Sequence, residues 1–323
     1  MGRELFLLRH GKSDWSTGVK DFDRPLKKRG KAGAQRIGAW LQENRVVPDR
    51  IISSPAARAI NTAEKCVKAA GLTARHVTVD PRLYMANVET TLGVLAEVSQ
   101  DSLRVMLVGH NPCLEEVLEY LARDRLRIPD DGKLLPTATV ARISMPDDWS
   151  ALARHSGEVV DVVRARSLPE KFPYPAPDGA ERRDRPAYYY TQSAVIPYRI
   201  KDGQPEVMVI GSSGKKHWSV PKGIVEPGLS PEESARQEAW EEAGITGQVD
   251  QNMLGSCQIE KWGAKCHVSV FAMKVENQMP SGQWQENHRG RKWVDIKTAC
   301  SLLKHNELKP ILLSLEKSLK QHG

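Results

Sequence analysis

The chain has 323 residues, of which 40% are hydrophobic, and it carries a formal charge of +7. This composition is ordinary for a globular protein, and the length favours two domains. No apolar run of about 18 residues occurs, so we expect no transmembrane helix and no membrane partner. The apolar stretch near the N-terminus is too short for the core of a signal peptide, and we therefore expect a cytoplasmic protein.

The isoelectric point near 9.1 has two interpretations. The surface is either a solvated, slightly basic one, or its charge attracts polyanionic substrates such as phosphate esters. Because the sequence contains no nucleic-acid recognition motif, we expect no specific nucleic-acid partner. The five cysteines are odd in number and none stands in a CxxC spacing. Reduced thiols are therefore expected, rather than a disulfide framework or a zinc site.

The first half of the chain alternates between short apolar runs and segments with helical periodicity. This alternation predicts an α/β domain with a largely parallel sheet, which we place at residues 1–167. The expected strands are Glu4–Arg9, Arg50–Ser53, Arg104–Gly109, Val140–Ser144 and Val159–Arg164, and the expected helices are Lys31–Glu43, Pro55–Ala70 and Pro112–Arg123.

Residues 168–187 contain five prolines and many charges, a composition that predicts a linker. Beyond it, residues 188–323 predict an α+β domain with a mixed sheet. A Lys-Asp-Gly turn at Lys201–Gly203 is typical of a hairpin. The expected strands here are Tyr189–Tyr198, Glu206–Ile210, Gly255–Glu260, His267–Val275 and Arg291–Asp295, and the expected helices are Pro231–Ala243 and Pro310–Lys320.

Three polar segments each follow an expected strand of the first domain, namely Leu8–Gly11, Ser53–Arg58 and Gly109–Pro112. In an open parallel sheet, ligands bind outside the carboxyl ends of the strands. We therefore expect all three segments to bring polar groups to one edge. Pro55 and Pro112 suit the first position of a helix, with Ser54 and Asn111 as caps. Helix N-termini placed there would direct backbone N–H groups at an anion.

The residue types in these segments suit phosphoryl chemistry. A neutral imidazole is a nucleophile that can carry phosphate as an intermediate, and His10 is the candidate. Guanidinium groups match phosphate oxygens in pairs, which makes Arg9 and Arg58 candidates for holding the phosphate. His110 would add a donor to the transferring oxygens. A lone Arg-His-Gly would equally suit a structural edge residue, so the prediction depends on all three segments together.

Four strings carry a resemblance: LFLLRHGKSDW at the start, DRPLKKRG at Asp23–Gly30, SSPAARAINTAE at Ser53–Glu64 and VMLVGHNP at Val105–Pro112. Through them, residues 1–165 resemble the histidine phosphatase superfamily, specifically its small SixA-like phosphohistidine phosphatases. The resemblance implies a three-layer α/β fold, His10 as the phosphorylated nucleophile, and Arg9, Arg58 and His110 as the phosphate pocket. It implies no metal or other cofactor in this half.

The proton donor to the leaving group stays open. Many members of the superfamily use a carboxylate, whereas the small branch often lacks an obvious one. Glu89 lies in the right stretch, although its position equally suits an exposed helix residue. Without a donor, leaving groups that need no strong acid are favoured, such as a phosphorylated imidazole.

A second constellation lies in Trp218–Thr246, WSVPKGIVEPGLSPEESARQEAWEEAGIT. A capping box at its Ser-Pro-Glu-Glu starts the helix, and a glycine ends it. Within the helix, Glu238, Glu241 and Glu242 fall at i, i+3 and i+4 and share one face. Carboxylates so close repel one another unless a hard cation such as Mg²⁺ lies between them. Such a cation can bridge a diphosphate and activate water. The alternative is a solvated acidic face.

This stretch resembles the Nudix box, G-x5-E-x7-R-E-U-x-E-E-x-G-U, where U is a bulky aliphatic residue. The matches, with Gly223 as the first glycine, are Glu238, Glu241, Glu242, Gly244 and Ile245. The resemblance covers residues 188–323. It implies Mg²⁺ or Mn²⁺ held by the three glutamates, with Glu238 also catalytic and with assistance from the Lys222-Gly223 backbone.

Three positions depart from the box: Leu229 replaces its first Glu, Gln237 its Arg, and Ala239 a larger aliphatic residue. In the family that Glu and Arg brace the loop against the helix. Their joint loss leaves no orphan charge, so we interpret it as a replaced brace. Glu226 is a candidate for a supporting role, and Glu286 for a further base from a later loop.

Two hypotheses follow for the whole chain. In the first it is a bifunctional hydrolase, which cleaves a diphosphate in a nucleotide-like small molecule and removes a phosphate. In the second it is a signalling protein, which dephosphorylates phosphohistidine on a protein partner and senses a ligand through a weakly catalytic Nudix module. The WSVPKG segment is similar to Nudix branches acting on dinucleoside polyphosphates or diphosphoinositol phosphates. Trp218 and Trp262 suit either stacking on a base or burial in the core.

Overall fold

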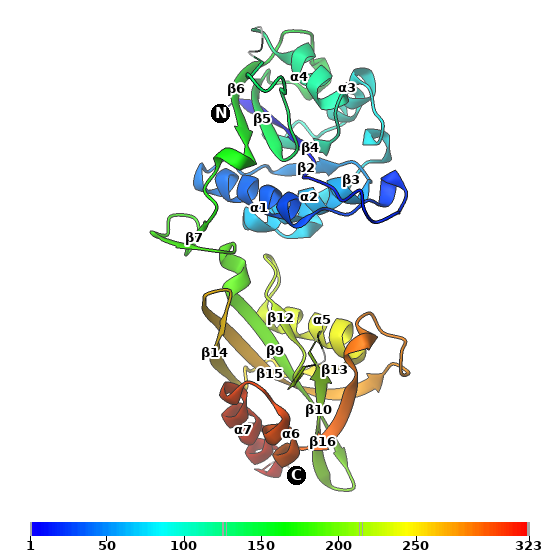
Figure 1. The fold of residues 1–323 in the computed structure, drawn as a ribbon, viewed down its shortest axis with the longest axis vertical. Helices are drawn as coiled ribbons and strands as arrows, with labels where there is room; N and C mark the ends of the chain where they lie inside the picture. The colour runs from blue at the N-terminus through cyan, green and yellow to red at the C-terminus, as the bar shows by residue number, and fades with distance from the viewer. Residues whose placement is uncertain (1, 125, 127, 213, 215, 322–323) are drawn as a thin grey trace. The chain divides into compact units, whose positions relative to one another are not determined.

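The computed structural model describes residues 2–124, 126, 128–212, 214 and 216–321. These residues divide into two compact units, unit 1 ending at Pro186 and unit 2 beginning at Ala187. Figure 1 traces both. Within the described ranges, no helix combines the length and apolar content that crossing a membrane requires.

Unit 1 is built on a six-stranded sheet in the order β3-β2-β4-β1-β5-β6. Its first four strands are parallel, β5 pairs antiparallel with β1, and β6 pairs antiparallel with β5. The strands are β1 (Arg3–Arg9), β2 (Arg50–Ser53), β3 (Val77–Val79), β4 (Arg104–Gly109), β5 (Thr139–Met145) and β6 (Glu158–Arg164), and the helices are α1 (Lys28–Glu43), α2 (Ala57–Ala69), α3 (Val88–Ala96) and α4 (Cys113–Leu121). Strand β3 and helix α3 were not predicted from sequence.

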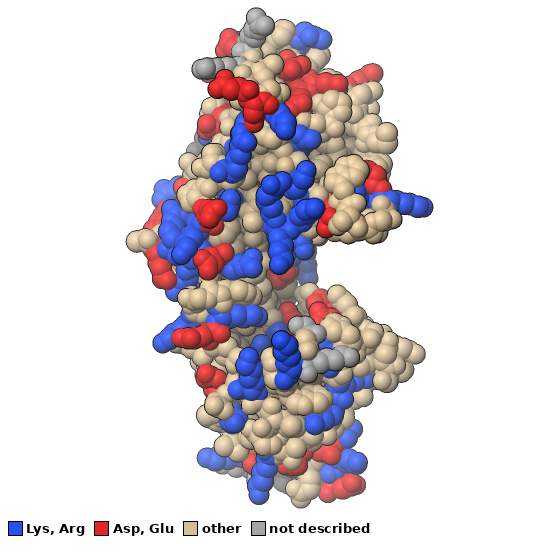
Figure 2. Space-filling model, in the orientation of Figure 1, with Lys and Arg blue, Asp and Glu red and all other residues tan. Residues whose placement is uncertain are grey.

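Two helical layers cover this sheet, with α1 and α2 on one face and α3 and α4 on the other (Figure 1). Strand β1 feeds both cores because successive side chains of a strand point to opposite faces. Leu5 and Leu7 pack into the core beneath α3 and α4, while Phe6 and Leu8 pack beneath α1 and α2. The predicted three-layer α/β fold is therefore confirmed. Basic side chains gather on the face that α1 and α2 form (Figure 2).

The segment at residues 168–187, where composition predicts a linker, contains a small hairpin. Strands β7 (Phe172–Tyr174) and β8 (Glu181–Arg183) pair antiparallel and contact α1. Phe172 is buried, and Arg182 forms an ion pair of 3.0 Å with Glu43 at the end of α1. These contacts place the hairpin within unit 1.

Unit 2 contains an eight-stranded mixed sheet, in which β9 pairs parallel with β15 and antiparallel with β10 and β12. Its strands are β9 (Thr191–Lys201), β10 (Gln204–Gly211), β11 (Trp218–Ser219), β12 (Lys222–Ile224), β13 (Ile245–Val249), β14 (Gly255–Lys261), β15 (Ala264–Gln278) and β16 (Arg291–Asp295), and its helices are α5 (Pro231–Ala243), α6 (Ile296–Leu302) and α7 (Lys309–Gln321). The predicted mixed-sheet fold is confirmed.

Helix α5 packs on one face of this sheet, and α6 and α7 pack on the other. The predicted start of α5 is present in full: Ser230 accepts from the Glu233 N–H at 3.1 Å, and the Glu233 carboxylate accepts from the Ser230 N–H at 2.7 Å. Gly244 ends the helix in the left-handed conformation. The predicted hairpin turn joins β9 to β10, with positive φ at Asp202 and Gly203.

Candidate functional sites

The three predicted segments of unit 1 meet at the carboxyl ends of β1, β2 and β4. These strands are neighbours in the sheet, so the residues that follow them lie at one edge. The ring centroids of His10 and His110 are 5.1 Å apart, and the Ser54 hydroxyl lies 2.8 Å from His110 Nε2. The structure thus brings together side chains from all three segments.

His10 is held in one orientation by its own loop. Its Nδ1 lies 2.8 Å from the Gly11 carbonyl, so Nδ1 carries the proton and Nε2 presents its lone pair. The loop packs tightly on α1 at Gly30, where a Cβ would lie 2.3 Å from the Lys12 carbonyl oxygen. Only glycine fits there, so Gly30, the last residue of the DRPLKKRG string, allows the loop after His10 to lie against α1.

Burial keeps both imidazoles neutral. It lowers the pKa of His10 to about 3, and the nearby His110, Arg58 and Arg9 act in the same direction. It lowers the pKa of His110 to about 4, where Arg58 again contributes. A neutral His10 at ordinary pH has the lone pair that a nucleophile requires.

We expect His10 and His110 to remain neutral at pH 5.5, where an imidazole with the ordinary histidine pKa of 6.5 is mostly protonated. The lowered pKa means that the neutral form persists as the pH falls. Histidine ring chemical shifts, followed by NMR from pH 8 to pH 4, measure this directly. Assignment uses the spectra of His10→Ala and His110→Ala. A midpoint near 6.5 for either ring would contradict the burial argument.

The two predicted arginines lie beside these rings with partly satisfied guanidinium groups. Arg9 donates to the Leu135 carbonyl at 2.7 Å. Arg58 is buried and donates to the backbone carbonyl of Asp21 at 2.6 Å and to its carboxylate at 2.9 Å. The Nε atoms of both arginines are buried without a partner. Both guanidinium groups therefore keep an unpaired N–H donor beside the histidine pair.

The predicted helix caps are wrong. Helix α2 begins at Ala57 with Ala56 as its N-cap, and α4 begins at Cys113 with Pro112 as its N-cap. The Ser54 hydroxyl instead contacts His110, and the Asn111 side chain donates to the Leu135 carbonyl at 3.0 Å. Both polar side chains support the site rather than a helix end.

Asp21 is a site residue that sequence reasoning missed. Its carboxylate accepts from Arg58, from Arg24 at 2.6 Å and from the Tyr84 hydroxyl at 3.0 Å. Partial burial opposes its ionisation, but the Tyr84 hydrogen bond and the two guanidinium groups outweigh it and lower its pKa. No motif marked this aspartate, because it lies in the loop before α1 and only the fold brings it to Arg58.

The Asp21 carboxylate accepts from a donor of Arg58, the residue that we predict to bind phosphate. We expect Asp21→Asn to lower the inhibition constant of inorganic phosphate by about threefold, since it removes one competing ion pair. Inhibition of phosphatase turnover measures this. Asp23→Asn, an exposed neighbour, is the matched control. Weaker phosphate inhibition in Asp21→Asn would indicate instead that the carboxylate positions Arg58 for its ligand.

Glu89, the candidate proton donor, lies on the exposed surface in the first turn of α3. It lines a separate depression with Glu116, Glu119 and Arg154, not the cavity at His110. The structure therefore does not bring Glu89 to the histidine pair, and the surface interpretation holds.

In unit 2 the three predicted glutamates line one cavity of about 240 Å³ between α5 and β12. Glu238 lies directly over Gly223, where a Cβ would come within 1.8 Å of its carboxylate oxygen. Glycine at the first position of the box is thus required by this close approach. Burial raises the pKa of Glu238 to about 8, and Glu242, Glu241 and Glu286 add to the effect by repulsion.

Glu242 is held by two groups. It accepts from the Lys222 backbone N–H at 3.0 Å and forms an ion pair of 2.5 Å with Arg289. Arg289 also pairs with Glu286 at 2.5 Å. Sequence reasoning missed Arg289, which lies in a loop outside the box. Within the described ranges, no three His, Cys, Asp or Glu side chains stand in the arrangement of a formed metal site.

The replaced brace positions also line this cavity. Gln237 donates from its side-chain amide to the Glu241 carboxylate at 2.8 Å, and Leu229 lies at the same cavity. The residue that replaces the family's arginine is thus engaged with one of the three glutamates. Ala239 is fully buried against the sheet.

The residues predicted to assist the three glutamates or to stack on a base lie partly at the cavity and partly in the core. Glu226 and Trp262 line the glutamate cavity. The Glu286 backbone N–H donates to the Glu241 carbonyl at 3.0 Å, which brings Glu286 beside the cluster. Trp218 packs against the core instead.

An adjoining cavity of about 310 Å³ shares Lys222, Lys261 and Glu242 with the first. Its remaining charged or titratable lining residues include Arg289, Lys304, His217 and His305. Burial lowers the pKa of the Lys222 ammonium, and Lys261 adds to this by repulsion. Cations thus crowd beside the glutamates.

Comparisons with known proteins match each unit separately. The model of the histidine phosphatase superfamily (branch 1) matches residues 5–103, and the NUDIX domain model matches residues 190–314. A candidate phosphohistidine phosphatase SixA from Nakamurella multipartitia has a solved structure that is 28% identical. It covers 51% of this chain and 96% of that one, with a TM-score of 0.44.

Two curated relatives match the second unit. The chloroplastic Nudix hydrolase 21 of Arabidopsis thaliana is 31% identical in an alignment of 169 residues that covers 45% of this chain and 82% of the relative. The asymmetrical bis(5'-nucleosyl)-tetraphosphatase of Sus scrofa is 28% identical over 109 residues, which are 33% of this chain and 74% of the relative. The chain therefore belongs to the Nudix family through its C-terminal domain, and its N-terminal domain belongs to the histidine phosphatase superfamily, so both units are of hydrolase families.

Proposed function

We propose that the chain is a bifunctional phosphate hydrolase with one independent site in each unit. Unit 1 hydrolyses a phosphomonoester or phosphoramidate through a phosphohistidine, and unit 2 cleaves a diphosphate bond in a nucleoside or dinucleoside polyphosphate. The observation that carries the proposal is the pairing of His10 and His110 at one edge of the sheet, where their ring centroids lie 5.1 Å apart and His10 Nδ1 lies 2.8 Å from the Gly11 carbonyl.

In unit 1, the Nε2 lone pair of His10 attacks phosphorus, and the bond to the leaving atom breaks. Arg9, Arg58 and His110 stabilise the phosphoryl oxygens. A water molecule then attacks the phosphohistidine and restores the lone pair of Nε2. One water is consumed: its oxygen joins phosphorus, one proton ends on the leaving group and the other stays on phosphate.

In unit 2, the residues present fit a divalent cation such as Mg²⁺ or Mn²⁺. Burial raises the pKa of Glu238, and repulsion from the neighbouring carboxylates of Glu242, Glu241 and Glu286 raises it further. Oxygen-rich, anionic donor sets are those that Mg²⁺ prefers. Glu238, Glu241 and Glu242 would hold the metal, which would polarise the diphosphate and activate water when bound. Lys222 and Lys261 would then neutralise further phosphate oxygens, which supports a polyphosphate as substrate.

The Sus scrofa relative is named for the hydrolysis of a dinucleoside tetraphosphate, and it guides the choice of trial substrates. We expect diadenosine tetraphosphate, nucleotide sugars or oxidised nucleoside triphosphates, given with Mg²⁺, to yield cleavage products resolved by chromatography. EDTA should stop this cleavage. An unchanged rate of cleavage in excess EDTA would contradict a metal-dependent site in unit 2.

A second candidate is a phosphohistidine protein phosphatase whose Nudix module senses a ligand. Two of the three glutamates already have partners, Glu242 with Arg289 and Glu241 with Gln237, and this favours weakened catalysis. Silence across the substrate panel, combined with ligand-induced shifts in melting temperature, would support this candidate over the first.

A further inference from the structure

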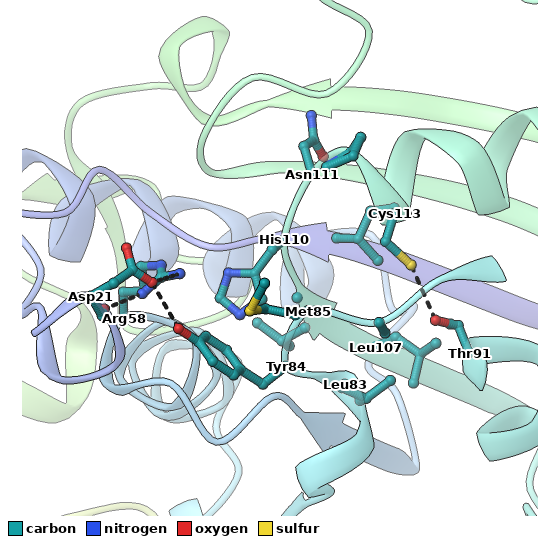
Figure 3. Close-up of a pocket in the computed structure, with 15 residues that line it drawn as sticks. Asp21, Arg58, Leu83, Tyr84, Met85, Thr91, Leu107, His110, Asn111 and Cys113 are labelled. Carbon is teal, nitrogen blue, oxygen red and sulfur yellow. Dashed lines mark hydrogen bonds and ion pairs between the residues drawn. The ribbon is translucent and has the colours of Figure 1, made fainter.

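A cavity of about 590 Å³ opens beside His110 in unit 1, and the mechanism above uses only its entrance. In Figure 3, Asp21 and Arg58 lie on one side of His110, and Leu83, Leu107, Thr91 and Cys113 lie on the other. The phosphoryl group needs only the charged end. The volume falls within the range of about 300–1,000 Å³ that is usual for small-molecule sites.

The inner end of this cavity has a largely apolar lining. Its two side chains with polar groups at this end, Thr91 and Cys113, already have partners. Thr91 donates to the Asn87 carbonyl at 2.9 Å, and its hydroxyl lies 3.2 Å from the Cys113 sulfur. Burial raises the pKa of the Cys113 thiol, which therefore stays protonated. Leu83, Leu107 and Leu114 also line the cavity, and the side-chain amide of Asn111, a further lining residue, donates to the Leu135 carbonyl at 3.0 Å. An apolar group gains from burial here, whereas a polar one would lose its water.

The cavity lies where a leaving group can depart. In phosphoryl transfer the attacking and leaving atoms lie roughly in line, on opposite sides of phosphorus. His110 lines the cavity, whereas His10 does not. A group displaced by His10 can therefore move into the cavity past His110. The Tyr84 ring stands edge-on to His110 at 5.9 Å and to Phe22 at 5.1 Å, which gives the entrance an aromatic wall.

The charges at the entrance limit the kind of leaving group. Asp21 is the one carboxylate among the described residues that line this cavity, and its ion pairs with Arg58 and Arg24 keep it ionised. An ionised carboxylate cannot donate the proton that an alkoxide needs. A phenolate leaves without such help, because an aromatic hydroxyl with a pKa of about 10 is a far stronger acid than an alcohol.

We propose that this cavity is a leaving-group subsite for an aromatic ring, so that unit 1 hydrolyses aryl phosphate monoesters. The inference rests on the phosphatase activity proposed for unit 1. An apolar ring fills the inner end, the phosphate lies between Arg58 and the two histidines, and the phenolic oxygen departs on the His110 side. The same chemistry occurs in a free aryl phosphate and in a phosphotyrosine side chain.

The binding test uses the full chain and two non-hydrolysable probes, 1-naphthylmethylphosphonate and methylphosphonate. We expect calorimetry to give a dissociation constant at least about tenfold lower for the naphthyl probe, because its ring is removed from water. Equal affinities would overturn the proposal. This comparison needs no turnover, so a failure of the proposed phosphatase activity would be seen separately, as absence of hydrolysis.

The variant test fills the cavity from its rim. Ala86→Phe should lower the ratio of kcat/KM for 1-naphthyl phosphate to that for phosphoramidate, a small substrate with no ring, by about tenfold or more. Ala153→Phe, at an exposed loop position outside the cavity, should leave the ratio unchanged. An unchanged ratio in Ala86→Phe would contradict the subsite. A phosphotyrosyl peptide assayed beside 1-naphthyl phosphate distinguishes a phosphotyrosine side chain from a free aryl phosphate. The substrate with the higher kcat/KM identifies the form that the cavity admits.

Discussion

Replacing His10 with alanine is expected to lower phosphatase turnover by a factor of about 10³ or more, because the proposed nucleophile is removed. Metal-dependent diphosphate cleavage should be unaffected, since unit 2 has its own sheet and cores. Both activities are measured on the same preparation, one with 1-naphthyl phosphate and one with a polyphosphate substrate and Mg²⁺.

The spared activity is the internal control for folding in this experiment. His76→Ala, at an exposed position of unit 1, is the matched control for loss of a histidine. If His10→Ala keeps its phosphatase turnover, the histidine pair is not the reacting centre. If both activities fall together, the two sites are not independent.

Replacing Glu241 with glutamine is expected to have the reverse effect. The change removes one of three carboxylate charges at the proposed metal site, and we expect cleavage at a fixed Mg²⁺ concentration to fall by about 100-fold. Phosphatase turnover should not change. Titration of Mg²⁺ then separates a loss of metal affinity, which high Mg²⁺ rescues, from a loss of the chemical step.

Glu232→Gln is the matched control, because Glu232 lies in the first turn of the same helix and does not line the glutamate cavity. It pairs with Arg236 at 2.5 Å, so its charge is also partnered in the folded state. Equal losses in the two variants would mean that the overall charge of α5, rather than the cluster, governs activity.

Both folds could be predicted because the informative patterns are local. The alternation of Leu5, Phe6, Leu7 and Leu8 supplies both cores of unit 1 from one strand. The capping box at Ser230 defines the start of α5 within the sequence itself. In both cases the physics depends on residues a few positions apart, which a sequence displays directly.

Residues that reach their site through the fold could not be found in this way. Asp21 is 37 positions from Arg58, and the loop before α1 brings them together. Arg289 follows Glu242 by 47 positions in the sequence, yet the two side chains form an ion pair. The caps at Ser54 and Asn111 were mispredicted because their side chains have partners in the site that local propensity cannot reveal.

The most direct test of the two-site account is to trap the phosphoenzyme of the full chain in excess EDTA. Unit 1 should still react, and mass spectrometry of alkaline digests should locate one phosphoryl group on the peptide that contains His10. A phosphoryl group on another residue, or a phosphoenzyme that forms only when Mg²⁺ is restored, would contradict the account.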